Sequence, residues 1–138
     1  METMIMTQEL HWMILTVLMT ALFWLPYLLD RLLSRGLVGT VRSDTPETGE
    51  QQSIWAKRAM KAHENAVENL AVFSPAVLVL HALNISTPAT RLAVVVYFFA
   101  RLAHYVVYTA GIPLGRTLTF TVGWLAQLVL IATILGWI

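Results

Sequence analysis

The 138-residue chain contains no cysteine. This absence excludes disulfide bonds, metal sites built from thiolates and a cysteine nucleophile. Any thiol chemistry that the protein performs must therefore use a thiol that arrives with a substrate. The chain also shows no signal-peptide pattern, because no basic residue precedes its first apolar stretch. We expect that stretch to be a retained membrane helix.

Charged residues are scarce as well, since Asp, Glu, Lys and Arg make up 12% of the chain and hydrophobic residues make up 57%. An ordinary soluble domain is about one quarter charged. So few charges cannot cover the surface of a soluble protein, and a net charge of +1 offers little attraction for nucleic acid. We therefore expect an integral membrane protein without a nucleic-acid partner.

Several apolar stretches reach the length of about 20 residues that a membrane-spanning helix needs. We predict helices over about 10–29, 53–83, 89–112 and 118–138, with a long polar loop over about 30–52 whose start can be helical. Pro26 should kink or end the first helix, and Ser53 is the expected N-cap of the second. Because the later connections are short, neighbouring helices should be antiparallel. The predicted fold is all-α: an integral membrane antiparallel four-helix bundle forming a single domain over residues 1–138.

Basic residues predict the orientation, because they favour the cytoplasmic side of a membrane. Those at the first and third connections are Arg31, Arg35, Arg42, Lys57, Arg58, Lys61 and Arg116. The opposite side has Arg91. The long first loop should therefore face the cytoplasm, with both termini on the other side.

Two polar stripes enter segments that are otherwise apolar. The first contains Arg58, Lys61, Asn65, Glu68 and Asn69, and the second contains Arg101, His104, Tyr105 and Tyr108. In antiparallel neighbours with a rise of about 1.5 Å per residue, Glu68 and Arg101 fall at the same depth. An unpaired charge inside a membrane costs at least ~2.5–3.5 kcal/mol. We therefore predict an ion pair between Glu68 and Arg101.

The remaining polar groups suit an anionic ligand rather than a metal ion. Three basic residues surround the predicted cytoplasmic mouth, namely Arg58, Lys61 and Arg116, and the wall below contains Asn65, His104, Tyr105 and Tyr108. This set predicts a ligand with several carboxylates that enters from the cytoplasm and directs one end towards lipid. No metal site is predicted, because His63 points away from the polar face of its helix.

The same residues carry a resemblance to a known family. Residues 61–68 read Lys-Ala-His-Glu-Asn-Ala-Val-Glu. This resembles the Arg/Lys-Ala-His-x-Asn-x-x-Glu pattern of the MAPEG family, the membrane-associated proteins of eicosanoid and glutathione metabolism. Ala100, Arg101, His104 and Tyr108 match a second family pattern, Ala-Arg-x-x-His-x-x-x-Tyr. The four apolar segments follow in the right order, so the resemblance covers essentially the whole chain. Glu68-Asn69-Leu70 looks more like the bacterial branch.

The resemblance implies a homotrimer that binds glutathione between neighbouring subunits, near the cytoplasmic side of what would be a bacterial inner membrane. Carried over by position, the candidate glutathione contacts are Lys61, Asn65, Glu68, Arg101, His104, Tyr105, Tyr108 and Arg116. Arg58, at the mouth, is a further glutathione-binding candidate. The thiol-activating arginine of the family falls on Arg116, which becomes the catalytic candidate.

The implied activity is conjugation of glutathione thiolate to a hydrophobic electrophile, or reduction of a lipid peroxide. A free thiol has a pKa near 8.5, so little thiolate exists at neutral pH. Arg116 close to the sulfur would favour the thiolate, and a hydroxyl from Thr117 or a tyrosine would add a hydrogen bond. The hydrophobic substrate would enter from membrane lipid.

Alternatives stay open at this point. The basic residues Arg58, Lys61 and Arg116 are also what membrane anchoring at a cytoplasmic surface requires. Glu68 and Arg101 can be a purely structural pair, Tyr105 and Tyr108 can be interfacial aromatics, and His104 can serve helix packing. The alternative function is a non-catalytic protein of the same fold that binds a lipid or a partner.

Overall fold

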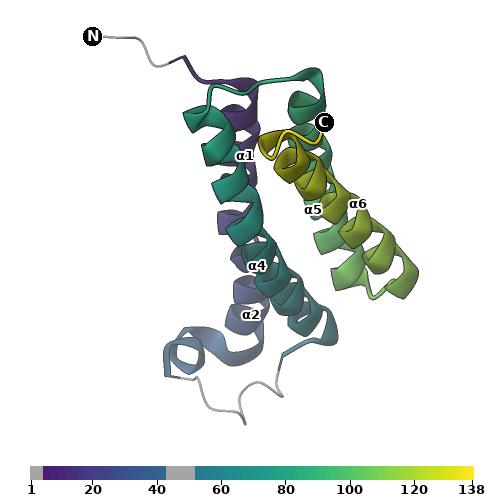
Figure 1. Ribbon diagram of the computed structural model, residues 1–138. Coiled ribbons are helices and arrows are strands. Elements are labelled where there is room, and N and C mark those ends of the chain that lie inside the picture. The colour runs from purple at the N-terminus through teal and green to yellow at the C-terminus, as the bar shows by residue number, and fades with distance from the viewer. Residues whose placement is uncertain (1–4, 43–51) are drawn as a thin grey trace.

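A computed structural model describes residues 5–42 and 52–138. Its helices are α1 (Gln8–Leu22), α2 (Trp24–Arg42), α4 (Ile54–Ala82), α5 (Pro88–Ala110) and α6 (Pro113–Ile134). The described residues contain no strand. Helices α1 and α2 follow one path along the bundle, α4 runs back beside them, and α5 and α6 form a hairpin next to α4 (Figure 1). The prediction of an all-α four-helix bundle is confirmed.

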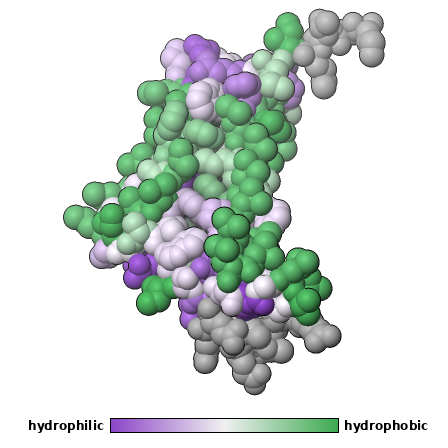
Figure 2. Space-filling view, turned by 180° about the vertical axis from the view of Figure 1, so that it is seen from behind, coloured by the Kyte–Doolittle hydropathy of each residue, from purple (hydrophilic) through white to green (hydrophobic). Residues whose placement is uncertain are grey.

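The bundle has the surface of an integral membrane protein. Among the described residues, four helical stretches are long and apolar enough to cross a membrane, with α1 and α2 counted as one. Large apolar side chains such as Leu92, Phe99 and Val106 face outwards. Figure 2 shows a broad hydrophobic band across the middle of one face, with hydrophilic residues gathered towards both ends. In water this band would be costly, whereas lipid covers it.

The first helical path breaks near Pro26, as predicted, but it is longer than predicted. Helix α1 ends at Leu22. In a continuous helix the backbone N–H of residue 26 would donate to the Leu22 carbonyl, but Pro26 has no N–H. Helix α2 then continues to Arg42, with a second break at Gly36, whose φ of 71° is a left-handed conformation that glycine adopts freely. The polar segment predicted from residue 30 is therefore helical up to residue 42, which is the helical start that the sequence left open, extended over 13 residues. Residues 43–51 of that predicted loop lie outside the described part of the chain.

Asp30 joins α2 to the start of α4. Ser53 stands at the N-cap position of α4, as predicted, but its side chain makes no capping hydrogen bond. Its hydroxyl instead donates to Asp30 Oδ1 at 2.6 Å, and its backbone N–H donates to Asp30 Oδ2 at 3.1 Å. The Asp30 carboxylate therefore ties α2 to the residue that precedes α4.

The apolar core lies where α1, α4, α5 and α6 meet. Phe73 of α4 and Tyr97 of α5 stack with ring centroids 3.8 Å apart. Val77, Val94 and Leu130 are fully buried in the same core.

The end of α4 near Ser53 has a different buried surface, because every buried residue in the first half of the helix is alanine. These residues are Ala56, Ala59, Ala62 and Ala66. Small side chains let helices approach closely in membranes. This half of α4 therefore packs through its backbone and small side chains, while its polar residues lie on other faces.

A buried carboxylate joins the opposite end of the bundle. Glu9 in the first turn of α1 is 2% exposed. Its Oε1 atom accepts hydrogen bonds from Ser86 Oγ at 2.8 Å and Thr90 Oγ1 at 2.7 Å. Thr90 also completes the capping box at the start of α5 with Thr87. Glu9 thus holds the start of α1 against the turn between α4 and α5.

We expect Glu9→Leu to destabilise the protein by about 1–3 kcal/mol, because it removes the acceptor of the Ser86 hydroxyl and one of the two acceptors of the Thr90 hydroxyl. Thermal unfolding in detergent, followed by circular dichroism, measures the change. The matched control is Glu64→Gln, because Glu64 is exposed and its ion pair with Lys61 lies at the surface. Equal unfolding temperatures for the two variants would contradict this role of Glu9.

Candidate functional site

The turn between α5 and α6 builds the site. Gly111 ends α5 in the left-handed conformation, with φ 78°. Its N–H donates to the Tyr108 carbonyl and the Ile112 N–H donates to the Val107 carbonyl, each at 3.0 Å, which is the Schellman pattern of a helix end. Pro113 then begins α6, where its fixed φ suits the first helical position. This tight turn brings the first turn of α6 beside the last turn of α5.

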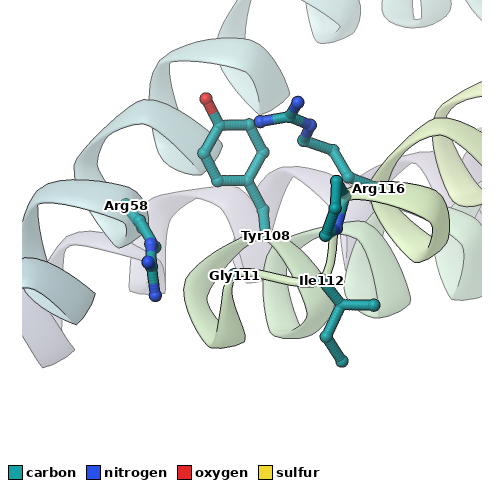
Figure 3. Close-up of a pocket in the computed structure, with 6 residues that line it drawn as sticks. Arg58, Tyr108, Gly111, Ile112 and Arg116 are labelled. Atoms are coloured by element: carbon teal, nitrogen blue, oxygen red, sulfur yellow. The ribbon is translucent and has the colours of Figure 1, made fainter.

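A cavity of about 210 Å³ opens at this turn. Its lining residues are Arg58, Tyr108, Gly111, Ile112, Pro113 and Arg116. The Arg116 guanidinium carbon lies 5.0 Å from the centroid of the Tyr108 ring, within the range of a cation–π contact. Figure 3 shows Arg58 and Arg116 on either side of Tyr108.

Arg58 reaches the cavity beside Gly111. A Cβ atom placed on Gly111 would collide with the Arg58 guanidinium, so any side chain there would displace it. Two guanidinium groups therefore line one small cavity. Planar guanidinium groups bind carboxylates through paired hydrogen bonds, which makes this cavity suitable for an anion.

A chain of buried polar groups crosses the bundle next to the site. Arg101 is 2% exposed, and its Nη2 atom donates to Asn65 Oδ1. Asn69 Nδ2 donates to the Asn65 carbonyl at 2.9 Å, and Gln127 Nε2 donates to the Asn69 carbonyl at 3.1 Å. The chain joins α5, α4 and α6, and it gives partners to polar groups that have no water to bind in a membrane.

The predicted ion pair between Glu68 and Arg101 is wrong within the chain. Both residues are described, and Arg101 contacts the amide of Asn65 rather than the carboxylate of Glu68. Glu68 is exposed and lines a second cavity with Tyr27 and His63. Arg101 therefore meets a residue of α4 that precedes Glu68 by three positions, about one helical turn.

The other predicted glutathione contacts lie outside the arginine cavity, each in a different part of the structure. Lys61 is exposed and pairs with Glu64 at 3.1 Å, outside the arginine cavity. The Tyr105 hydroxyl donates to the Phe23 carbonyl at 2.8 Å, and the two rings stack with centroids 3.9 Å apart. Tyr105 therefore supports the break between α1 and α2. His104 is buried and does not line the cavity.

Of the predicted set, the structure gathers Arg58, Tyr108 and Arg116 in one cavity. Sequence reasoning missed Gly111, Ile112 and Pro113 as part of its wall. A glycine followed closely by a proline between two helices signals a tight turn, but not that an arginine of another helix packs against it. Asn69 and Gln127 are polar residues in apolar helices, but the sequence does not give their partners, which depend on three helices at once.

The fold and the site define a membrane-spanning helical bundle with a cationic cavity near one end. The MAPEG family model matches residues 10–136, nearly the whole chain. The protein therefore belongs to the MAPEG family, which includes glutathione transferases and peroxidases. No curated protein and no solved structure matches the chain significantly. The assignment to the bacterial branch stays a prediction.

We expect Gly111→Ala to destabilise the protein more than Gly136→Ala. Both glycines have positive φ, 78° and 72°, so each substitution carries the left-handed penalty of about 1–2 kcal/mol. The Cβ at Gly111 also meets the far end of the exposed Arg58 side chain, whereas nothing lies within 4 Å at Gly136. Because that side chain can move, we expect the additional loss of stability at Gly111 to be small. Thermal unfolding measures both. Introducing Arg58→Ala into the Gly111→Ala protein should remove this additional loss of stability. If the additional loss persists, it would contradict the contact with Arg58.

We expect Asn65→Leu to destabilise the protein by about 1.5–3 kcal/mol, because it removes the acceptor of a buried guanidinium. Glu68→Gln should change stability little, since Glu68 is exposed and does not contact Arg101. Chemical unfolding in mixed detergent measures both. A larger loss of stability in Glu68→Gln than in Asn65→Leu would contradict this expectation and would indicate that Glu68 stabilises Arg101 instead.

Proposed function

We propose that the protein is a glutathione-dependent membrane enzyme that conjugates glutathione thiolate to a hydrophobic electrophile or reduces a lipid peroxide. The observation that carries this proposal is the placement of Arg58 and Arg116 on either side of Tyr108, in one cavity of a MAPEG-family chain. Glutathione has two carboxylates and one thiol. The Arg58 guanidinium suits one of the carboxylates, and Arg116 close to the sulfur suits the thiolate.

Arg116 is the proposed catalytic residue. Lowering a thiol pKa from about 8.5 to about 6.5 requires about 2.7 kcal/mol, which a nearby cation supplies when water is partly excluded. Arg58 and Arg116 are exposed in the single chain, so a neighbouring subunit would have to exclude that water. Tyr108 is the proposed hydroxyl donor to the sulfur, because its hydroxyl makes no hydrogen bond to another described residue. Thr117 is less suited to this role, since its hydroxyl already donates to the Pro113 carbonyl at 3.2 Å.

The size of the cavity supports an oligomeric site. Small-molecule pockets usually have volumes of about 300–1,000 Å³, and this cavity has about 210 Å³. One chain would therefore supply part of a complete site. A homotrimer, the usual assembly of the family, would let a neighbouring subunit add Lys61, Glu68 or other residues that face outwards. The proposed location is a bacterial inner membrane, with this end of the bundle facing the cytoplasm.

An apolar groove supports the alternative function, a non-catalytic protein of the MAPEG fold that binds a lipid. The groove has a volume of about 320 Å³ between α5 and α6. Its lining residues are Ala89, Leu92, Ala93, Val96, Val122, Leu125, Ala126 and Val129. In the enzyme, the same apolar surface would lie in the lipid from which a hydrophobic substrate enters.

Titration of the detergent-purified protein with glutathione tests the proposal, with thiolate absorbance in the ultraviolet as the signal. We expect saturable thiolate formation in the wild-type protein and a loss of at least about tenfold in Arg116→Ala, the change that one pKa unit of the thiol produces. Arg58→Ala should weaken glutathione binding more than it changes the thiolate formed per bound glutathione.

Lys57→Ala is the matched control, because Lys57 is an exposed basic residue of α4 that does not line the cavity. It should leave both binding and thiolate formation unchanged. Saturable binding without thiolate would overturn the catalytic role of Arg116. No binding at all would favour the lipid-binding alternative.

A further inference from the structure

His104 lies behind the cavity rather than in its wall. It is 2% exposed on α5, and the cavity is lined instead by Tyr108, one turn further along the same helix. Any effect of His104 on catalysis must therefore pass through another group. A role for His104 in catalysis thus rests on the proposed function of Arg116.

The hydrogen bonds of His104 define which ring nitrogen carries the proton. Nδ1 lies 3.2 Å from the Arg116 carbonyl oxygen and 3.2 Å from Thr119 Oγ1. The carbonyl can only accept, and the Thr119 hydroxyl donates to the Gly115 carbonyl at 2.7 Å. Nδ1 therefore carries a hydrogen and donates it to α6. The Nε2 atom is buried without a partner in the described residues.

We propose that His104 is a positioning residue that holds the first turn of α6 and thereby places the Arg116 guanidinium over Tyr108. The backbone of Arg116 is fixed to α5 through His104, and its side chain rests on the Tyr108 ring of the same helix. Both the backbone and the side chain of Arg116 are thus held against α5.

The turn sets where α6 begins, but glycine leaves room for the helix to rotate. Gly111 stands in the turn and Gly115 in the first turn of α6, and glycine has more backbone freedom than any other residue. The hydrogen bond from His104 crosses from α5 to α6 just beyond these glycines and selects one rotation of α6. A change at His104 should therefore move Arg116 without removing any group that lines the cavity.

Three variants separate this role from packing. Asn places its side-chain nitrogen close to the position of Nδ1, Gln places its nitrogen near the position of Nε2, and Leu has no donor. We expect His104→Asn to retain the hydrogen bond to α6 and His104→Gln and His104→Leu to lose it. Hydrogen exchange of the amides of residues 116–120 in the glutathione-free protein is the first readout. The exchange rate of these amides should rise about tenfold in His104→Gln and His104→Leu, the change expected for losing one hydrogen bond.

The second readout is the thiolate formed per bound glutathione. It should fall about tenfold in His104→Gln and stay within about twofold in His104→Asn, with each variant compared at equal ligand occupancy. In an Arg116→Ala background, His104→Gln should cause no further loss, because both changes act through one group. Even if the Leu variant fails to fold, the Asn and Gln variants complete this comparison.

Unchanged hydrogen exchange in His104→Gln would overturn the inference. So would a further loss of thiolate in the Arg116→Ala background, because His104 would then act through a group other than Arg116, such as Tyr108, whose ring centroid lies 5.6 Å from that of His104. If the wild-type protein forms no thiolate but the exchange pattern is as expected, the proposed function fails while the positioning of α6 by His104 stands.

Discussion

The bundle depends on giving its buried polar groups protein partners in place of water. Arg101, Asn65, Asn69 and Gln127 achieve this by hydrogen bonding in series across three helices. Association of helices within lipid gains little from the hydrophobic effect, so packing and such hydrogen bonds decide the arrangement. The chain of bonds fixes how α4, α5 and α6 are rotated about their axes.

That rotation determines which side chains reach the cavity. With α4 and α5 fixed at Asn65 and Arg101, Arg58 extends to Gly111 at the end of α5. The short turn then brings Arg116 back over Tyr108. The cavity is therefore a consequence of two constraints: a polar interior that sets helix rotation, and a tight turn that sets the start of α6.

The sequence was informative about the membrane bundle and about the mouth of the site. Long apolar stretches and a helical period of polar residues predict spans and faces, and Arg58, Tyr108 and Arg116 do share a cavity. The partner of Arg101 was not predictable in this way, because spacing gives depth along a helix but not rotation between helices. The length of the helix over residues 30–42 was underestimated, since charges and glycines there suggested a loop with no more than a helical start.

The neutral partner of Arg101 has a consequence for the site. A buried cation is usually paired with a carboxylate, but Asn65 supplies only a dipole to this guanidinium. Tyr108 lies seven residues further along α5, which is about 10 Å of helix. At that distance in a partly apolar interior, a charge is screened much less than in water. The interior of the bundle therefore adds positive potential behind the two arginines, which supports the proposal of an anionic ligand for the cavity.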